Sequence, residues 1–344
     1  MSERVESIVA HALGSGAVVT SRTRLPGGAS RETWALDVSV DGTRRELVLR
    51  LDSPGASLNA TGGGLPAEAR LMRAAAEAGV PVPAIVAASG GEGGPPYPLK
   101  GAPDDRGGVP YILMERVGGE TIPRKILRDA AFARARPLLA AQCGAALAAV
   151  HRMPLDAVTV TGEAGQDPLL QWRDVLDLTG QPHPVFELAF RRLAASRPPP
   201  AGRTVVHGDF RNGNLIVGPE GVRAVLDWEL AHTSDPIEDL GWLCVKAWRF
   251  GSPLPVGGFG GYDELIDAYE QAGGRPVDRA ALRWWETFGV LKWGVICVMQ
   301  TMRHLAGGAR SVELAAIGRR VCENEWDLLE LLNRPAAYGS RRAG

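Results

Sequence analysis

Three oxygen-bearing side chains stand close together in one part of the sequence. Asp209 and Asn214 belong to the segment His-Gly-Asp-Phe-Arg-Asn-Gly-Asn at residues 207–214, and Asp227 follows after one predicted hairpin. Oxygen ligands of this kind suit Mg²⁺, and phosphoryl transfer also needs a group that positions the attacking hydroxyl. The pattern therefore predicts a site that holds Mg²⁺ and a nucleoside triphosphate beside the hydroxyl group of a substrate.

The three side chains are predicted to have different roles. Asp209 would orient the substrate hydroxyl group or accept its proton, whereas Asn214 and Asp227 would donate oxygen ligands to Mg²⁺. The alternative is a loop whose Asp and Asn side chains only satisfy the backbone of a turn. The His-Gly pair before Asp209 and the Leu-Asp-Trp-Glu segment at residues 226–229 favour the catalytic interpretation.

Size and charge indicate a globular protein that binds small molecules. The chain of 344 residues, with 45% hydrophobic and 22% charged residues, is long enough for two lobes with separate cores. Its net charge of −1 gives no reason to expect a nucleic acid or an anionic membrane as partner, because both would favour a clustered excess of Lys and Arg. We therefore expect a small-molecule ligand, while the oligomeric state stays open.

The amino terminus, the most apolar segment and the cysteines favour a cytoplasmic protein. The first seven residues are polar and acidic, unlike a secretory signal, and the most apolar run, residues 290–299, contains Lys292 and is predicted to be a buried helix. The four cysteines are far apart, without the close pairs of a zinc site or a disulfide framework, and we expect them to be reduced core residues. They are Cys143, Cys244, Cys297 and Cys322.

The first third of the chain is predicted to form a small antiparallel sheet with one helix. Asp41-Gly42 is a hairpin turn between alternating segments, and residues 66–79 have Pro near the start and Gly at the end, as helices do. The predicted strands include residues 34–40, 46–50, 83–88 and 111–117. Residues 52–64 and 89–110 have the composition of loops.

After residue 117 the pattern changes to long helical segments. These are predicted at residues 134–151, 168–178, 185–195, 240–248, 262–272, 279–304 and 309–332. The only strand signals in this part surround Asp209 and Asp227. The sequence thus predicts an α+β protein of two lobes, residues 1–117 and residues 118–344.

The motif around Asp209 is similar to that of a known family. Residues 207–214 and 226–229 together resemble the aminoglycoside phosphotransferase family, whose fold is similar to that of the protein kinases. The similarity extends to Asp239, and the resemblance implies that this Asp braces the catalytic loop. A helix N-cap before Leu240 is a compatible alternative for Asp239. The resemblance implies a bilobal kinase-like fold with a nucleotide-binding first lobe and an acceptor pocket in the second.

The resemblance also implies nucleotide contacts in the first lobe. The turn at Gly28, Ala29 and Ser30 resembles the phosphate-covering turn of the family, where backbone N–H groups approach phosphate oxygens, although an ordinary hairpin turn fits equally. Arg50 stands where the family usually has a Lys that grips the phosphates, and Glu68 is its expected partner. A surface ion pair is the alternative for these two residues.

The strand that ends the first lobe resembles the connection whose backbone contacts adenine. The resemblance implies that the carbonyl group of Glu115 and the N–H group of Val117 contact the base, with Met114 as an apolar neighbour. A buried strand at a lobe boundary would have nearly the same sequence. His207, two residues before the catalytic Asp, is expected to pack under the loop, as it does in kinase-like proteins.

The remaining histidines and the tryptophans give weaker functional signals. A metal-dependent hydrolase using His207, Asp209 and His232 is an alternative, although their spacing matches no recognised chelating pattern. Aromatic residues at helical spacing are more often core than binding site, which is the interpretation adopted for four tryptophans of the second lobe. These are Trp248, Trp284, Trp285 and Trp293.

The resemblance implies an ATP- and Mg²⁺-dependent kinase that acts on a hydroxyl group of a small metabolite. Residues 48–50 and 226–229 look closest to the branch whose kinase domains are sometimes fused to acyl-CoA dehydrogenases, so a hydroxyacyl-CoA or hydroxy acid is one candidate acceptor. Choline, homoserine, sugars and aminoglycosides stay open, although residues 250–344, with eleven acidic and eleven basic residues, lack the acidic excess that a polycation favours. A nucleotide-binding regulatory module without catalysis is the other alternative.

Overall fold

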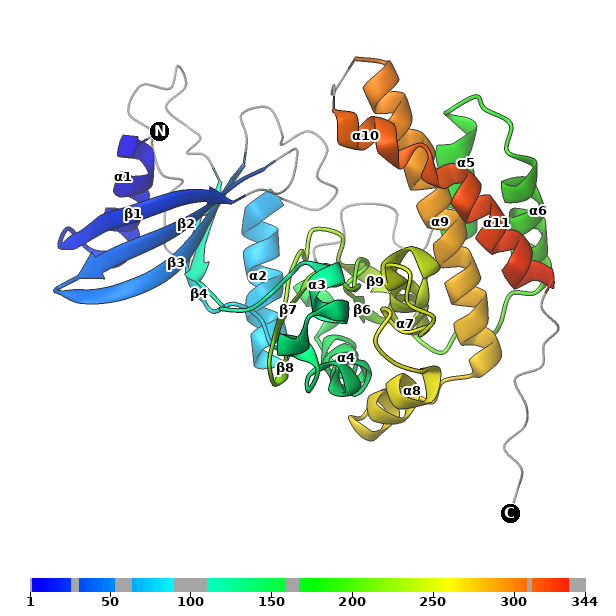
Figure 1. The fold of residues 1–344 in the computed structure, drawn as a ribbon, viewed down its shortest axis with the longest axis horizontal. Coiled ribbons are helices and arrows are strands. Elements are labelled where there is room, and N and C mark those ends of the chain that lie inside the picture. Colours follow the sequence, from blue (N-terminus) through cyan, green and yellow to red (C-terminus); the bar gives the residue numbers. More distant parts are fainter. Residues whose placement is uncertain are drawn as a thin grey trace.

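The computed structural model describes residues 2–25, 31–52, 64–89, 110–158, 167–307 and 311–333. A small sheet lies at one end of the molecule and a larger, mainly helical part at the other (Figure 1). This is the predicted α+β architecture of two lobes. The position of the lobe boundary at residue 117 stays a prediction.

The sheet is antiparallel, with the strand order β1-β2-β3-β5-β4. Its strands are β1 (Ala17–Leu25), β2 (Arg31–Val40), β3 (Thr43–Asp52), β4 (Ile85–Ala88) and β5 (Tyr111–Glu115). Asp41 and Gly42 both have positive φ, 48° and 81°, as a two-residue hairpin turn requires. The predicted hairpin is therefore present, and its turn fixes the register of β2 against β3.

Two helices cover the two faces of the sheet. Alternate residues of β5 point to opposite faces, so that Tyr111 and Leu113 pack with α1 (Ser2–Leu13), whereas Ile112 and Met114 belong to the core that includes α2 (Gly64–Glu77). The apolar stripe of α1 consists of Val5, Ile8 and Val9. We expected α2 but not α1, so this lobe has a second helix. In Figure 1, α2 lies between the sheet and the helical lobe.

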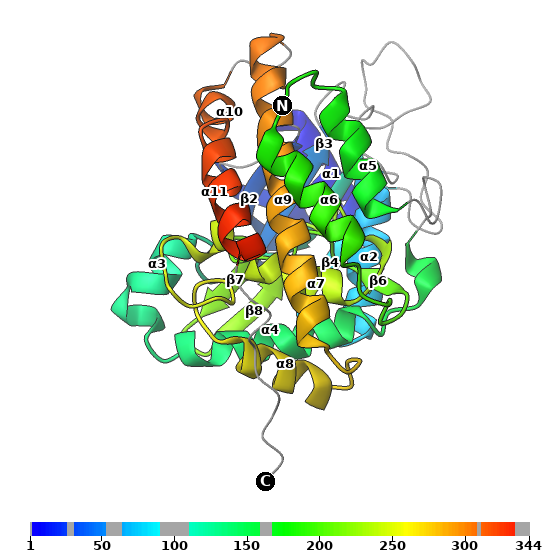
Figure 2. The same cartoon turned by 90° about the vertical axis from the view of Figure 1, so that its right-hand side faces the viewer.

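The helical lobe is built around one long helix, α9 (Arg279–Leu305), with α10 and α11 on one side and α5 and α6 on the other (Figure 2). The other helices are α3 (Pro123–Arg128), α4 (Arg136–Val150), α5 (Pro168–Asp177), α6 (Pro184–Ala195), α7 (Ile237–Cys244), α8 (Tyr262–Gln271), α10 (Val312–Ile317) and α11 (Arg320–Asn333). An added Cβ at Gly241 would lie 2.6 Å from Cβ of Trp285, so only glycine lets α7 approach α9 this closely.

Two predicted helices differ in detail from the structure. The segment expected as one helix over 309–332 is two helices, α10 and α11, separated by Gly318 and Arg319. The segment expected over 240–248 begins earlier, at Ile237, and becomes a short 3₁₀ helix, Lys246–Arg249, after α7 ends. In both places the apolar pattern of the sequence continues while the helix is interrupted, so periodicity alone does not indicate where the helix ends.

Two short strand pairs hold the polar segment. Strand β6 (Thr204–Val206) pairs with β9 (His232–Ser234), and β7 (Leu215–Gly218) pairs with β8 (Gly221–Val225). The loop that carries Asp209 connects β6 to β7. Within the described ranges, no helix is both long and apolar enough to cross a membrane.

The cysteines largely follow the prediction. Cys143, Cys244 and Cys297 are buried and free, but Cys322 is exposed on α11. The expectation of four core cysteines is therefore wrong for Cys322, because this helix covers α9 with only part of its surface and leaves that side chain on the outer side.

Candidate active site

The loop between β6 and β7 is held by a buried carboxylate. Asp239, fully buried, accepts hydrogen bonds from the backbone N–H groups of His207 (2.7 Å) and Gly208 (2.9 Å). Burial opposes the charge of Asp239, but hydrogen bonding and the nearby His151 hold its pKa below the usual value. The bracing role expected for Asp239 agrees with this geometry. The N-cap alternative does not, because α7 begins at Ile237 and Asp239 lies in its first turn.

Two neighbours of Asp239 explain why the loop has this sequence. Gly208 has φ of +79°, and a Cβ there would lie 2.4 Å from the carbonyl oxygen of Leu230, so only glycine fits. His207 is fully buried against Trp228, with its Nε2 3.0 Å from the carbonyl oxygen of Leu226 and its Nδ1 accepting from the N–H group of Asp209 (3.2 Å). His207 therefore supports the loop from beneath, as expected.

The carboxylate of Asp209 is fixed by three donors. Trp242 donates from its indole Nε1 to Oδ1 (2.8 Å), and Arg211 donates from Nε to both oxygens (3.0 and 3.1 Å). Asn214 donates from Nδ2 to Oδ2 (2.7 Å). The side chain of Asp209 keeps 13% of its surface exposed. The carboxylate is thus oriented by the protein and still accessible, which a group that positions a substrate hydroxyl needs.

Trp242 is a residue that the sequence analysis missed. It lies 33 residues after Asp209, on α7, and its ring also packs against the ammonium group of the buried Lys292 at 4.8 Å. Lys292 in turn lies 3.3 Å from Glu238. Although burial alone would raise the pKa of Glu238, His232 and Lys292 hold it far below the usual range. A buried charge network therefore lies behind the tryptophan that orients Asp209.

The two predicted metal ligands lie beside each other. The backbone N–H of Leu226 donates to the carbonyl oxygen of Asn214 (2.8 Å), which places Asp227 next to Asn214. Asp227 has φ of 68°, a left-handed conformation that is strained for Asp, and its side chain is 36% exposed. The amide nitrogen of Asn214 faces Asp209, so its Oδ1 lies on the opposite edge of the amide group.

These ligands fit Mg²⁺ bound together with phosphate. Mg²⁺ takes one or two protein oxygens and completes its shell with phosphate oxygens and water. Asn214 and Asp227 supply such oxygens. Among the described residues no group of three or more His, Cys, Asp and Glu is placed to hold a metal by itself. The hydrolase alternative with His207 and His232 as ligands is therefore not supported.

A charged cluster adjoins Asp227 on the side of the sheet. Glu68 on α2, 2% exposed, accepts from Arg50 on one carboxylate oxygen and from Arg31 on the other, the latter at 2.6 Å. Arg50 also lies 4.0 Å from Asp227. The predicted pair of Arg50 and Glu68 is thus present, and it is buried rather than a surface pair. Arg31 was not predicted.

We call this set the Glu68 cluster: Arg31, Arg50, Asp52, Glu68, Asp227 and Glu229. Arg31 lies 3.4 Å from Asp52 and 3.3 Å from Glu229, so one guanidinium group contacts three carboxylates. Burial raises the pKa of Asp52, and burial together with Asp227 raises that of Glu229. Four carboxylates against two guanidinium groups give the cluster an excess of negative charge, which favours a divalent cation beside Asp227.

The remaining predicted nucleotide contacts are placed less completely. Gly28, Ala29 and Ser30 lie outside the described residues. Met114 is buried and lies between Val48 of β3 and Ile85 of β4 in the sheet. Glu115 ends β5 and Val117 follows it, where the chain leaves the sheet toward the helical lobe; the side chain of Glu115 pairs with Arg45. Their adenine contacts stay predictions.

A family comparison decides the relationship. The model of a phosphotransferase enzyme family matches residues 21–285, which include most of the sheet, the Glu68 cluster and the loop of Asp209. The chain belongs to this phosphotransferase family. The relationship that was inferred from the motif is therefore confirmed.

Relatives and solved structures agree with this result. The chain is 30% identical over 223 residues to acyl-CoA dehydrogenase family member 10 of Mus musculus; the match covers 62% of this chain and spans about a fifth (19%) of that protein. A crystal structure from Ralstonia eutropha JMP134, of a protein assigned to the aminoglycoside phosphotransferases, superposes with a TM-score of 0.72 at 22% identity, covering 96% of this chain and 98% of the other.

A further structure shares the fold at lower identity. An aminoglycoside phosphotransferase solved in a ternary complex with AMP-PNP and hygromycin B superposes with a TM-score of 0.59 at 16% identity, covering 97% of this chain and 99% of the other. At such identities the two superpositions show a shared fold. The predicted kinase-like α+β fold class is confirmed.

Proposed function

We propose that this protein transfers the γ-phosphate of ATP, with Mg²⁺, to a hydroxyl group of a small metabolite. The observation that carries the proposal is the carboxylate of Asp209, oriented by three donors and placed next to the oxygen pair of Asn214 and Asp227. Membership of a phosphotransferase family supports it. So does the AMP-PNP in a structure of the same fold.

Each residue of the site has a defined task in this proposal. Asp209 aligns the hydroxyl group of the acceptor for in-line attack and receives its proton as the new bond to phosphorus forms. Asn214 and Asp227 would hold Mg²⁺, which supplies charge neutralisation for the phosphates when it is bound. Because Asn214 also donates to Asp209, the hydroxyl-binding and metal-binding groups are held in one rigid arrangement.

Arg50 is proposed to contact the phosphates in place of the usual lysine. Its guanidinium group is anchored on Glu68 and lies 4.0 Å from Asp227, so its permanent charge is presented beside the metal ligand. We further propose residues 1–117 as the nucleotide-binding lobe, with Met114, Glu115 and Val117 at the adenine, Gly28, Ala29 and Ser30 at the phosphates, and residues 118–344 as the lobe that binds the acceptor.

For the acceptor we propose a hydroxyacyl-CoA or a hydroxy acid. The name of the mouse relative supports this choice, because it links a related sequence with acyl-CoA chemistry. Aminoglycosides, choline and sugars are the alternative acceptors. Arg50 at the position of the usual Lys is the one feature that favours a regulatory module without catalysis, whereas Asp209, Asn214 and Asp227, all present, count against it.

A transfer assay tests the proposal. The protein is incubated with Mg-ATP and a panel that contains hydroxyacyl-CoA thioesters, hydroxy acids, choline, sugars and aminoglycosides. ADP release and the mass increase of one phosphoryl group on an acceptor are measured, with EDTA in place of Mg²⁺ as control. We expect Mg²⁺-dependent phosphorylation of at least one acceptor; Mg-ATP binding without phosphorylation of any acceptor would contradict the proposal.

A further inference from the structure

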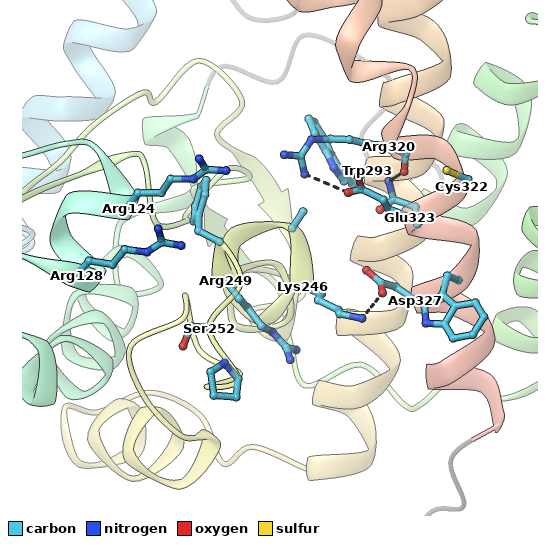
Figure 3. Close-up of a pocket in the computed structure, with 16 residues that line it drawn as sticks. Arg124, Arg128, Lys246, Arg249, Ser252, Trp293, Arg320, Cys322, Glu323 and Asp327 are labelled. Carbon is cyan, nitrogen blue, oxygen red and sulfur yellow. Dashed lines mark hydrogen bonds and ion pairs between the residues drawn. The ribbon is translucent and has the colours of Figure 1, made fainter.

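A large pocket in the helical lobe is lined by more cations than carboxylates. Its volume is about 860 Å³, and it lies between α3, the 3₁₀ segment Lys246–Arg249 with the turn that follows, and the helices α9 and α11. Figure 3 shows the arginines of α3 on one side of the opening and the residues of α11 on the other. Five cations line it, namely Arg124, Arg128, Lys246, Arg249 and Arg320, against the two carboxylates Glu323 and Asp327.

The cations of this pocket are not equally engaged. Lys246 contacts Asp327 at 2.5 Å, Arg320 lies 3.5 Å from Glu323, and Arg249 contacts Glu286 at 2.6 Å. Arg124 and Arg128 form no ion pair with any other described residue. They are exposed, lie four residues apart on α3 and therefore stand on the same side of that helix (Figure 3). The pocket thus offers two guanidinium groups without a neutralising partner in the described part of the chain.

The pocket adjoins the loop of Asp209. The guanidinium group of Arg211, which contacts Asp209, lies 4.7 Å from the ring of Trp248, and Trp248 packs against Trp293 with ring centroids 4.9 Å apart. Trp293 lines the pocket. On the other side of the loop, a Cβ at Gly213 would lie 3.6 Å from Pro123, the first residue of α3. A ligand in the pocket therefore lies next to the loop that carries Asp209.

The two tryptophans add unused donors. The indole N–H groups of Trp248 and Trp293 are buried and have no hydrogen-bond acceptor among the described residues. A buried donor without an acceptor costs free energy unless a ligand or water satisfies it. Of these two residues Trp293 lines the pocket, and its unused donor together with the unpaired arginines favours a ligand that accepts hydrogen bonds and carries negative charge.

Resting on the function proposed above, we propose that this pocket binds the anionic part of the acceptor. The ligand chemistry is an acceptor with phosphate or carboxylate groups, and Arg124 and Arg128 are its direct ligands. Guanidinium groups bind both kinds of oxyanion through paired hydrogen bonds. The volume suits a ligand of several hundred daltons. A polycationic acceptor would meet the wrong sign of charge here.

The pocket is separate from the proposed nucleotide site. All residues that line it fall between 124 and 327, whereas the anionic Glu68 cluster draws four of its six members from residues 31–68. The anionic cluster therefore suits the Mg²⁺ ion that accompanies the nucleotide, whereas the pocket suits a free anion. Mg-nucleotide would lie at the cluster, and the anionic tail of the acceptor in the pocket.

A binding experiment tests the assignment. The full protein is first saturated with Mg-AMP-PNP, so that adenosine-containing probes cannot occupy the nucleotide site. Coenzyme A, which carries phosphates, and citrate, which carries carboxylates, are then titrated by calorimetry, with kanamycin as a polycation. We expect at least one of the two anions to bind more tightly than kanamycin, and the stronger one identifies phosphate or carboxylate as the preferred group.

Matched double variants make the test specific. Arg124→Gln with Arg128→Gln should weaken binding of the preferred anion at least tenfold. Lys125→Gln with Arg134→Gln removes the same charge from exposed positions that do not line the pocket, and should change binding less than twofold. Because all four side chains are exposed, both variants should fold, which an unchanged Tm verifies.

The outcomes separate this inference from the proposed function. If neither anion binds, if kanamycin binds more tightly, or if both double variants bind alike, the assignment of the pocket is wrong. If binding of the anion depends on Arg124 and Arg128 but no acceptor is phosphorylated, the assignment of the pocket holds and the proposed kinase activity is wrong. If an acceptor is phosphorylated and its KM is the same for the wild type and for the double variant of Arg124 and Arg128, only the assignment of the pocket is wrong.

Discussion

Two charged regions connect to Asp209, and they differ in how far their charges are already neutralised. In the Glu68 cluster, Arg31 and Arg50 are both committed to carboxylates, and the excess charge is negative. In the pocket between α3 and α11, called the basic pocket below, Arg124 and Arg128 have no such partner among the described residues, and the excess charge is positive. The comparison teaches that one side of Asp209 is prepared for a divalent cation and the other for an anion.

The two regions also differ in their location and in the burial of their charges. The cluster lies where the small sheet meets the helical lobe; its charges are mutually paired, and Arg31, Asp52 and Glu68 are buried. The pocket lies on the surface of one lobe, between helices that pack around α9. Changes in the cluster should therefore affect stability and metal-nucleotide binding together, whereas changes in the pocket should affect the acceptor alone.

Within the Glu68 cluster, the largest effect on turnover is expected from removing the carboxylate of Asp227. Asp227→Ala leaves Asn214 as the single predicted metal ligand from the loop, so turnover should fall about 10³-fold and Mg²⁺ should no longer strengthen ATP binding. Calorimetric titration of ATP with Mg²⁺ and with EDTA measures the difference. Glu220→Ala, on the turn of the same hairpin, is the control and should behave as wild type. Unchanged Mg²⁺ dependence in Asp227→Ala would remove this residue from the metal site.

A second change removes the negative centre of the cluster. Glu68→Gln leaves Arg31 and Arg50 short of one buried carboxylate, so the free energy of unfolding should fall by about 3 kcal/mol and the KM for ATP should rise. Thermal denaturation and steady-state kinetics measure the two effects. Glu77→Gln, exposed on the same helix, should leave both values as in wild type. If Glu68→Gln were as stable as Glu77→Gln, the paired charges of the cluster would not contribute to stability as proposed.

A smaller effect is expected at the tryptophan that orients Asp209. Trp242→Phe keeps an aromatic ring beside Lys292 but removes the 2.8 Å hydrogen bond to Asp209. Since a hydrogen bond to a charged group is worth about 1.5–3 kcal/mol, kcat should fall roughly tenfold or more while ATP affinity stays the same. Trp284→Phe, which loses a hydrogen bond to the carbonyl oxygen of Leu193 instead, is the control. Equal kcat values for the two variants would exclude an orienting role for Trp242.

The smallest effect concerns pH. Burial lowers the pKa of His232, but Glu238 outweighs it, so the pKa is raised overall. The pair should therefore stabilise the fold fully below the unfolded pKa of about 6.5 and lose this contribution as pH rises through the raised folded value. The wild type should exceed His232→Gln in stability by less than about 1 kcal/mol at pH 6, because the ring is partly exposed. Thermal denaturation from pH 5.5 to 9 tests this: a stability difference that grows with rising pH would contradict it.

Much of the site was predictable because its residues are local in sequence. Asp209, Asn214 and Asp227 lie within twenty residues, and the β7–β8 hairpin brings the last two together. Arg31 was missed, although the signal was present. The two-residue turn at Asp41-Gly42 fixes the register, and counting back from it places Arg31 opposite Asp52.

Other contacts could not be read from the sequence. The hydrogen bond from Trp242 to Asp209 depends on the orientation of α7 against α9, which close packing at Gly241 sets. The basic pocket draws on four segments distant in sequence, and four of its five cations lie outside residues 250–344, the segment whose charges were counted. Charge counts average over a segment, whereas a ligand meets only the side chains that the fold gathers.

The central claim is that Asp209 serves the acceptor while its neighbours serve the metal and the nucleotide. Asp209→Asn keeps the size of the side chain and removes its charge, so turnover of the best acceptor should fall about 10²- to 10⁴-fold, while the Kd for Mg-ATP should stay within about twofold of wild type. Measuring both quantities on the same preparation is the most direct test. Turnover equal to that of wild type, or a loss of Mg-ATP binding that accounts for the whole decrease, would contradict the account.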